Sequence, residues 1–362
     1  MKIAFLGDIA LLGRASIEGN PLYMDYFHDV ASLLQSYDYV VGNLESPFSY
    51  QKKKYGAKSA FLSSDPQNVD LLNYLHVNAV TLANNHMFDY GRESFELTQH
   101  LLDKNEIAWF GLNGKELLLE FSGNKIAFTG FCCYSSNPQG CVEYGKYGVN
   151  ELDVRKAEEV LTRLHEKGYM NVCAIHAGIE HVNYPSLDTI ELAKRIVSIG
   201  TTIYYGHHPH VVQPVERMGN SLVAYSLGNF CFDDTYSKST DDKPHVELTE
   251  NNRSSFILSV TIDCNTIREY EIIPLYIGTK KMEIGRGVTK RLLDSYLDKM
   301  KTMTSDKYEE MRHEQRMEWV KPRLAKRDIA WVIKRLRPMY LKLMISNNAN
   351  AKNYKKHVSD QL

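Results

Sequence analysis

Short apolar runs alternate with longer segments of helical period along most of the chain. Three early runs stop at polar residues, and they occupy positions 2–8, 37–46 and 78–86. The segments between them, 24–36 and 66–75, repeat their apolar residues at helical intervals, and Asp65 followed by Pro66 is typical of a helix start. Each crossover between strands is therefore expected to be a helix, which predicts an α/β protein.

The middle of the chain adds hairpins to this alternation. A Ser-Gly-Asn turn at 122–124 and a Gly-Asn turn at 219–220 each separate two apolar runs, which favours a β-hairpin. The expected hairpin strands are 117–121, 125–131, 214–217 and 221–225. Further helices are expected at 95–104, 154–166 and 187–199, with strands at 171–175 and 201–205.

The pattern changes near residue 285, where the strand signals end and Lys, Arg, Glu, Met and Leu dominate. Apolar residues recur at helical spacing between Ile329 and Leu343 among basic side chains, and Pro338 is expected to kink this helix. We therefore expect two parts, an α/β domain over residues 1–284 and a basic helical appendage over residues 285–362.

Charge is distributed unevenly over these two parts. The 362 residues carry a net charge of −1, with 43% hydrophobic and 24% charged residues, as is ordinary for a globular protein. Residues 290–362 hold 18 Lys and Arg against 9 Asp and Glu, whereas residues 1–289 hold 25 against 35. An acidic body suits a site that collects cations, and a basic tail suits an anionic partner such as a membrane surface or an acidic polymer. The competing interpretations of the tail are a solvated helical face and packing of Trp319, Trp331 and Tyr340 against the main domain.

Cysteines and apolar stretches bear on the cellular compartment. The six cysteines show no CxxC spacing and are expected to be reduced core residues: Cys132, Cys133, Cys141, Cys173, Cys231 and Cys264. Asp8 interrupts the first apolar run after a few residues, which argues against a secretory signal. No apolar stretch reaches the length of a transmembrane helix. We expect a cytoplasmic protein, with peripheral attachment to a membrane through the tail as a second expectation.

Five predicted strands end on residues of metal-ligand type. A lone His is more often a core or surface residue, and a lone Asp at a strand end is more often a helix cap. Five such ends in succession are a stronger signal, because open α/β sheets form their sites at the carboxyl ends of strands. Carboxylate, amide oxygen and imidazole together suit Mn, Fe or Zn rather than Mg or Ca alone. The five groups are Asp8, Asn43 with Glu45, residues 84–86, His176 with Glu180, and residues 206–210.

The last group contains two histidines around a proline. An extended backbone before Pro209 would send the imidazoles of His208 and His210 to the same side, toward adjacent metal positions. Gly206 would allow a close approach of the chain. His207 is expected to face away, as a surface residue or as a partner of a ligand.

Six short motifs occur along the chain: GD at 7–8, NLE at 43–45, NNH at 84–86 followed by DYG at 89–91, HxGxE at 176–180, GxHPH at 206–210 and SLGNF at 226–230. They stand in the order found in the CapA family of capsule and poly-gamma-glutamate synthesis proteins. The chain resembles this family over roughly residues 1–280, and the family looks like a relative of calcineurin-type metallophosphoesterases. The resemblance implies a four-layer sandwich, in which two β-sheets are flanked by helices, and a centre of two divalent metal ions.

The resemblance also implies a role for each matching residue. The metal ligands would be Asp8 and His210 for the first ion, Glu45 as a bridge, and Asn85, His176 and His208 for the second. His86 would be the proton donor or transition-state stabiliser, and Asp89 would orient it. Glu180 would support a ligand or act as a base, with an ordinary loop carboxylate as the competing interpretation.

Two positions depart from the phosphoesterase pattern. Ala10 stands where that pattern has a His two residues after the first Asp, and the bridging position carries Glu45 rather than Asp. The first metal site is therefore expected to have fewer ligands, to be weakly occupied, or to be open to substrate.

The expected function is hydrolysis in the biosynthesis of a cell-envelope polymer or exopolysaccharide. A metal pair would activate water on a phosphoester or amide bond, with an anionic polymer or its precursor as the client. The alternatives are a metal-dependent peptide epimerase and a non-catalytic accessory protein that binds a polymer or a polymer synthase complex. No motif indicates a nucleic-acid partner.

Overall fold

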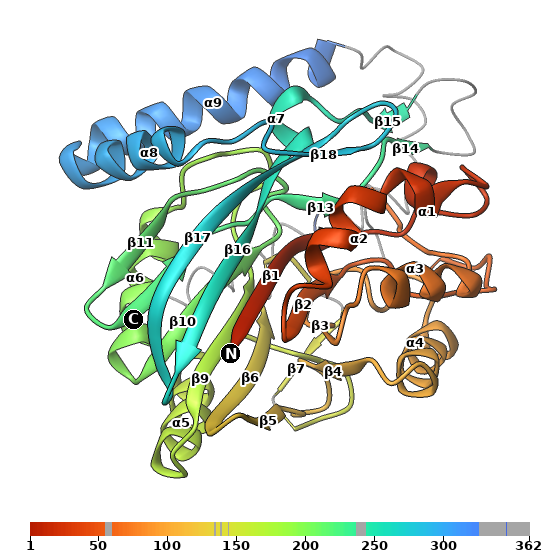
Figure 1. The fold of residues 1–362 in the computed structure, drawn as a ribbon. Helices are drawn as coiled ribbons and strands as arrows, with labels where there is room; N and C mark the ends of the chain where they lie inside the picture. Colours follow the sequence, from red (N-terminus) through yellow and green to blue (C-terminus); the bar gives the residue numbers. More distant parts are fainter. Residues whose placement is uncertain are drawn as a thin grey trace.

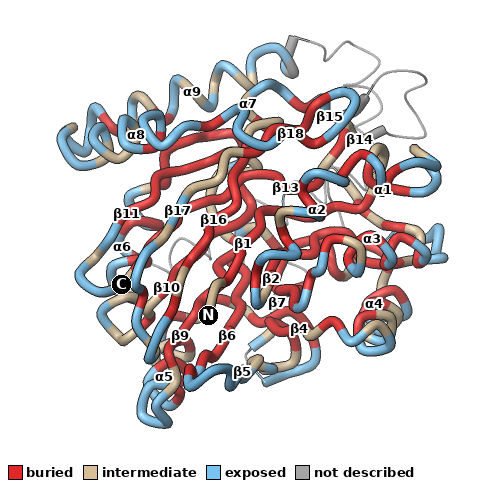
Figure 2. The backbone as a smooth tube through the Cα atoms, viewed as in Figure 1, coloured by how far each residue is buried: buried red, intermediate tan, exposed pale blue. Residues whose placement is uncertain are grey.

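Two β-sheets pack face to face and carry helices on their outer sides (Figure 1). The computed structural model describes residues 1–54, 60–133, 135–137, 140–143, 145–236, 244–325 and 345. This arrangement of helices, sheet, sheet and helices confirms the predicted four-layer sandwich. Figure 2 shows that the buried residues follow the strands, while exposed residues lie along the outer helices.

The first sheet is mixed and has the order β18-β17-β16-β1-β2-β3-β4, with β13 also paired to β1. β1 runs parallel to β2 and antiparallel to β16. Its strands are β1 (Lys2–Ile9), β2 (Tyr39–Leu44), β3 (Ala79–Thr81), β4 (Ala108–Phe110), β13 (Asn229–Cys231), β16 (Ser254–Asp263), β17 (Thr266–Ile277) and β18 (Met282–Ile284).

The second sheet has the order β11-β12-β10-β9-β6-β5. Its inner strands β6, β9, β10 and β12 are parallel, whereas β5 and β11 close the two edges as antiparallel hairpin partners. Its strands are β5 (Leu117–Phe121), β6 (Asn124–Cys132), β9 (Met170–His176), β10 (Thr201–His207), β11 (Val215–Met218) and β12 (Ser221–Ala224). Two small ribbons pair β7 (Cys141–Val142) with β8 (Val149–Asn150) and β14 (Thr235–Tyr236) with β15 (Pro244–Val246).

Apolar side chains from both sheets fill the space between them. Phe5 of β1 and Tyr205 of β10 meet there with ring centroids 4.9 Å apart. Phe128 of β6 contacts Phe110 of β4 at 5.8 Å, and all four side chains are fully buried. Strands buried on both faces give continuous apolar runs rather than alternation, which is why the sequence shows such runs at 2–8 and 201–205.

Helices cover the outer face of each sheet. The first sheet is covered by α1 (Tyr23–Tyr26), α2 (His28–Leu34), α3 (Val69–Tyr74) and α4 (Arg92–Lys104). The second sheet is covered by α5 (Val154–Glu166) and α6 (Leu187–Ser198), while α8 (Lys290–Thr302) and α9 (Ser305–Ala325) lie across one end of the two sheets (Figure 1). Short elements complete the described chain: η1 (Gly13–Ala15), η2 (Pro66–Asn68) and α7 (Glu250–Arg253).

Most predicted elements agree with the observed ones, and the predicted helix start is confirmed because the Asp65 side chain accepts a hydrogen bond from the Gln67 amide. The helix expected over 24–36 is instead divided at Phe27, which ends α1 and precedes α2. The third strand is only three residues long, since β3 stops at Thr81. The long hairpin of β16 and β17 was not predicted.

The C-terminal helices pack on the body of the protein as far as the described residues extend. Lys301 of α8 lies 2.8 Å from Glu216 of β11, and Tyr308 of α9 is buried against the second sheet's helical layer. The division of the chain at residue 285 stays a prediction, and the helix expected at 329–343, with Trp331, Pro338 and Tyr340, lies outside the described residues. None of the described helices has both the length and the apolar character needed to cross a membrane.

Candidate metal centre

The carboxyl ends of strands from both sheets converge on one site. Asp8 stands in β1 directly between Asn43 of β2 and Asn229 of β13. The strands approach so closely that a Cβ at Gly7 would lie 2.0 Å from the carbonyl oxygen of Gly228. The predicted close approach at Gly206 is confirmed in the same way, because a Cβ there would lie 1.9 Å from the oxygen of Tyr225.

Asp8 is fully buried and is surrounded by donors. Its Oδ1 accepts a hydrogen bond from Asn43 Nδ2 at 2.9 Å and lies 2.8 Å from His207 Nδ1. Its Oδ2 accepts from the His208 amide and lies 3.3 Å from His210 Nδ1. Burial alone would raise the pKa of Asp8, but the hydrogen bonds and charges of His207 and His210 hold it well below its ordinary value. Asp8 is therefore ionised at neutral pH.

His207 does not face away as the sequence suggested. Its side chain is fully buried, and its Nδ1 faces Asp8. Because β10 continues through this residue, the backbone carries the imidazole toward the sheet interface rather than toward solvent. His207 is thus a partner of a predicted ligand, which was the second of the two roles expected for it, and not a surface residue.

Glu45 follows β2 and is fully buried, but neither oxygen of its carboxylate has a hydrogen-bond partner among the described residues. Its Oε1 lies 3.5 Å from His210 Nε2 and 3.8 Å from His86 Nε2. Burial raises the pKa of Glu45 well above its ordinary value. Buried carboxylate oxygens normally have hydrogen-bond or cationic partners, so the two oxygens of Glu45 fit a position at which a cation would be the missing partner.

His176 and His208 supply imidazoles on the other side of the site. His176 Nε2 lies 3.0 Å from Asn85 Oδ1. The imidazole rings of His176 and His208 have centroids 4.9 Å apart. The Nδ1 atoms of both histidines are buried without a hydrogen-bond partner in the described chain. Burial lowers the pKa of His176, and lowers that of His208 to about 4. Both rings are therefore neutral at pH 7, in the form that binds metal ions.

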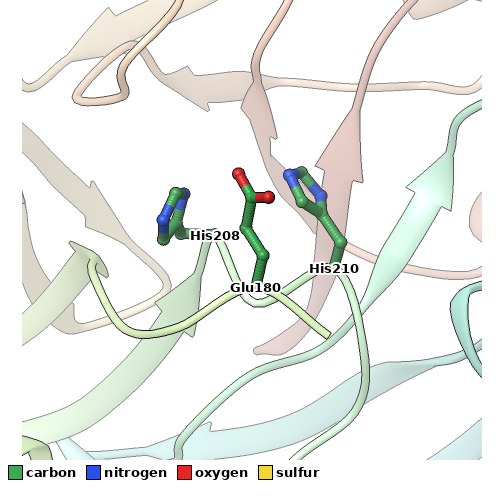
Figure 3. A group of neighbouring side chains, drawn as sticks. All are labelled: Glu180, His208 and His210. Carbon is green, nitrogen blue, oxygen red and sulfur yellow. The ribbon is translucent and has the colours of Figure 1, made fainter. Parts of the chain in front are cut away.

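Two overlapping groups of donors have the geometry of metal sites. Asp8, Glu45 and His210 form one group, and Glu180, His208 and His210 form the other, with ligand atoms within 4.8 Å of one another in each. Figure 3 shows the Glu180 carboxylate between the imidazoles of His208 and His210. The Glu180 side chain is 45% exposed, whereas the carboxylates of Asp8 and Glu45 are fully buried. The centre therefore opens to solvent on the Glu180 side.

The backbone around Pro209 differs from the extended form that was predicted. His208 has φ 96° and His210 has φ 55°, both in the region that non-glycine residues rarely adopt. In this conformation of the turn the His208 amide points at Asp8, whose carboxylate helps to stabilise the unusual backbone. The rings still share the site, with centroids 6.1 Å apart. Burial alone would lower the pKa of His210, but the charges of Glu45 and Asp8 raise it to about 10.

His86 and Asp89 form a close pair at the edge of the centre. His86 Nδ1 lies 2.6 Å from Asp89 Oδ2, and the same oxygen accepts a hydrogen bond from the Leu62 amide at 2.8 Å. Asp89 therefore fixes the ring of His86 with its Nε2 directed toward Glu45, 3.8 Å from Oε1.

The sequence analysis did not single out two residues of the site, Asn229 and Asn252. Asn229 Oδ1 lies 2.9 Å from His210 Nδ1 and leaves Nε2 of that ring facing Glu45. Asn252 donates to the His210 carbonyl at 3.0 Å and lies 2.8 Å from His181 Nδ1. Asn229 had a signal, because it belongs to the SLGNF motif, whereas Asn252 had none, and its part in the capping box of α7 appears only in the structure.

The chain is similar to proteins of capsule and PGA biosynthesis. The family model described as "Bacterial capsule synthesis protein PGA_cap" matches residues 2–234. The "PGA biosynthesis protein CapA" of Bacillus subtilis (strain 168) is 28% identical over 251 residues, which are 67% of this chain and 66% of the relative. The "Capsule biosynthesis protein CapA" of Bacillus anthracis is 30% identical over 305 residues, 80% of this chain and 73% of the relative.

Solved structures also align with the chain. A putative 5'-nucleotidase from Staphylococcus aureus aligns with 14% identity and a TM-score of 0.48, over 82% of this chain and 58% of the other. The NAD nucleotidase of Haemophilus influenzae aligns with 12% identity and a TM-score of 0.45, over 88% and 60% of the two chains. The family match, by contrast, covers well over half of this chain and contains all six motifs and nearly all of the site. The chain thus belongs to the bacterial capsule synthesis protein PGA_cap family, in agreement with the resemblance to CapA proteins that its motifs predicted.

Proposed function

We propose that this protein is a metal-dependent hydrolase of capsule or poly-gamma-glutamate biosynthesis, with a centre of two divalent metal ions. The observation that carries the proposal is the buried carboxylate of Glu45, which has no hydrogen-bond donor among the described residues and lies between His86 and His210. Divalent cations held by Glu45 would supply the positive partners that its two carboxylate oxygens lack.

The donors divide naturally between two ions. Asp8, His210 and Glu45 would hold the first, as expected from the sequence. His176, His208 and Asn85 would hold the second together with Glu45, and Glu180 is close enough to join them from the open side. The mixture of imidazole and oxygen donors favours Mn, Fe or Zn.

Divalent ions in such a site would polarise a phosphoryl or acyl oxygen and make hydroxide available at neutral pH. The protein's own contribution is proton transfer and exclusion of water. His86, held by Asp89 at its Nδ1, presents Nε2 toward the centre and is placed to carry a proton to the leaving atom of a cleaved ester or amide. The buried Asp8 and Glu45 keep the inner side of the centre dry.

The charge of the centre favours an anionic client. Two divalent ions would carry four positive charges against the three carboxylates of Asp8, Glu45 and Glu180, since the fourth carboxylate, Asp89, is paired with His86. The chain spans 66% of the length of the Bacillus subtilis relative, whose name refers to PGA biosynthesis. An anionic polymer or its precursor is accordingly the proposed substrate class, and contact of the basic tail with a synthase complex or an anionic membrane surface remains part of the proposal.

Metal analysis of purified protein tests the centre directly. Wild type is expected to retain two equivalents of Mn or Zn after dialysis against a controlled metal buffer, whereas Asp8→Ala and His208→Ala are expected to retain one or none. His100→Ala is the matched control, because His100 is an exposed histidine of α4. Wild type without metal, or variants with unchanged metal content, would contradict the proposal.

The reaction class can be decided with the metal-loaded protein. A panel of phosphoesters and γ-linked peptides should yield cleavage products that disappear in His86→Ala. Incorporation of deuterium from solvent at an α-carbon without cleavage would indicate epimerisation instead. Undiminished client binding by His86→Ala, with no turnover by wild type, would indicate an accessory protein.

A further inference from the structure

The C-terminal helix α9 lies beyond the residues matched by the family model, yet it contacts a loop of the metal centre. We infer that Gln315 and Trp319 of α9 are positioning residues, which fix the loop 180–185 and with it the carboxylate of Glu180 and the turn that carries His210. This inference rests on the proposed metal centre and extends it to a helix outside the matched region.

One face of α9 contacts the loop residue by residue. Tyr308 donates to the Pro185 carbonyl at 2.9 Å, and Arg312 donates to the Tyr184 carbonyl at 3.1 Å. Gln315 accepts from the Asn183 amide at 2.8 Å and donates to its side-chain oxygen at 2.6 Å, and Trp319 stacks on His181 with ring centroids 4.0 Å apart. The spacing 308, 312, 315 and 319 is that of a single helical face. The helix and the loop therefore run antiparallel along four consecutive contacts.

The loop in turn contacts the turn that presents His210. The His181 amide donates to the Pro209 carbonyl at 2.8 Å, which is a backbone hydrogen bond between two loops. Asn183 Nδ2 donates to the Val212 carbonyl, also at 2.8 Å. These two hydrogen bonds hold the chain on either side of His210, so a displacement of the loop would move both flanks of this residue.

Asn252 adds a third connection between the loop and the turn. Its Nδ2 lies 2.8 Å from His181 Nδ1 and also donates to the His210 carbonyl at 3.0 Å. One amide group therefore contacts both histidines, and the position of the His181 ring bears directly on the backbone of His210.

The loop is held in a conformation that requires such support. His181 has φ 65°, a left-handed backbone that non-glycine residues rarely adopt. The Glu180 side chain is 45% exposed, so burial does little to fix it, and its Oε2 lies 3.7 Å from His181 Nε2. Stacking of Trp319 on His181 therefore acts at the residue on which the placement of Glu180 depends.

Two measurements on the full chain test this inference with four variants. Gln315→Ala and Trp319→Ala remove the contacts, Trp319→Phe keeps a stacking ring, and Glu314→Ala is the control at an exposed position of the same helix. Titration with Mn²⁺ should show at least one equivalent bound about tenfold or more weakly in the two alanine variants, as is usual when residues supporting a metal ligand are removed. Trp319→Phe and Glu314→Ala should bind as wild type does.

Hydrogen–deuterium exchange provides the readout that does not depend on metal. Amides of residues 180–184 should exchange faster in Gln315→Ala and Trp319→Ala than in wild type or the control. Unchanged exchange would overturn the inference, and so would faster exchange combined with wild-type Mn²⁺ affinity. If wild type itself binds no Mn²⁺, the proposed function fails, and the exchange rates alone decide whether α9 fixes the loop. Thermal melting identifies any variant that is unfolded, and the remaining alanine variant then carries the test.

Discussion

At the scale of single residues, the Glu45 carboxylate has the least compensated environment in the candidate centre. A buried carboxylate without donors destabilises a fold, and the raised pKa of Glu45 means that proton uptake relieves part of this cost when no metal is bound. Metal binding would relieve it more completely. Glu45 would thereby couple the stability of the protein to the metal concentration.

Replacing Glu45 with Gln should make the stability of the protein nearly independent of the metal concentration. Wild type should gain about 2.7 kcal/mol in the free energy of unfolding when free Mn²⁺ is about 100 times its Kd, because ligand binding stabilises the folded state by mass action. Glu45→Gln should lose most of this gain, since the bridging charge is absent. Urea unfolding with and without Mn²⁺ measures this gain in wild type and in Glu45→Gln. Glu166→Gln, at an exposed position, is the control. An equal metal-dependent gain in wild type and Glu45→Gln would rule out a bridging role.

The sequence indicated which donors would meet better than it indicated the residues that hold them. Asp8 and Glu45 stand at the ends of neighbouring parallel strands of the first sheet, and the carboxyl ends of such strands meet at one edge, so their proximity needed no knowledge of the loops. His176 ends a strand of the second sheet, and its approach to Asp8 depends on how the two sheets pack. The positive φ of His208 and the contacts of Asn252 depend on loop conformation, which hydrophobic periodicity does not encode. All six motifs lie within residues 2–234, whereas the helix that supports the Glu180 loop does not.

At the scale of elements, the hairpin of β16 and β17 shows why a strand pair escaped prediction. The strands are joined by a two-residue turn, Cys264-Asn265, with Asp263 paired to Thr266. Both turn residues have positive φ, 49° and 56°, as in a type I′ turn. Asn-Gly and Asp-Gly are the usual signals for this turn, and the chain has neither here. Asn265 is suited to the left-handed region, but Cys264 is not.

Substitution of Cys264 should therefore change stability in a direction set by the backbone. Cys264→Asn is expected to raise the free energy of unfolding by about 0.5 kcal/mol, because Asn tolerates the left-handed region. Cys264→Val is expected to lower it by about 1 kcal/mol, since a β-branched residue is strained there. Urea unfolding of the two variants measures the difference. Equal stability of Asn and Val at this exposed position would contradict a type I′ turn.

At the scale of the whole molecule, buried imidazoles make the free energy of unfolding depend on pH. The folded-state pKa of His208 is about 4, below its ordinary value of about 6.5. The unfolded chain therefore takes up a proton first as the pH falls, and the stability contributed by neutral His208 is lost between about pH 6.5 and 4. His210 acts in the opposite sense: its pKa of about 10 gives a contribution that is present below about pH 6.5 and is lost as the pH rises through 10.

A comparison of wild type with His208→Gln in the presence of a chelator isolates the first of these effects. The stability of wild type relative to the variant should be constant above about pH 6.5 and should fall below it by up to about 1.4 kcal/mol per pH unit. Urea unfolding at intervals between about pH 4 and 8 gives this difference directly. A difference that stays flat over the whole range would mean that His208 is not buried as a neutral ring.

The position of β1 in the middle of its sheet also has a consequence for biosynthesis. β1 pairs on one side with β2, which follows closely in the chain, but on the other side with β16, where Lys2 is opposite Thr261. On the ribosome, β1 emerges well before β16, so the edge of Lys2–Phe5 that pairs with β16 must stay unpaired until Leu258–Thr261 have been made. The nascent chain would need protection of that edge, by a chaperone or by transient local pairing, until β16 has emerged.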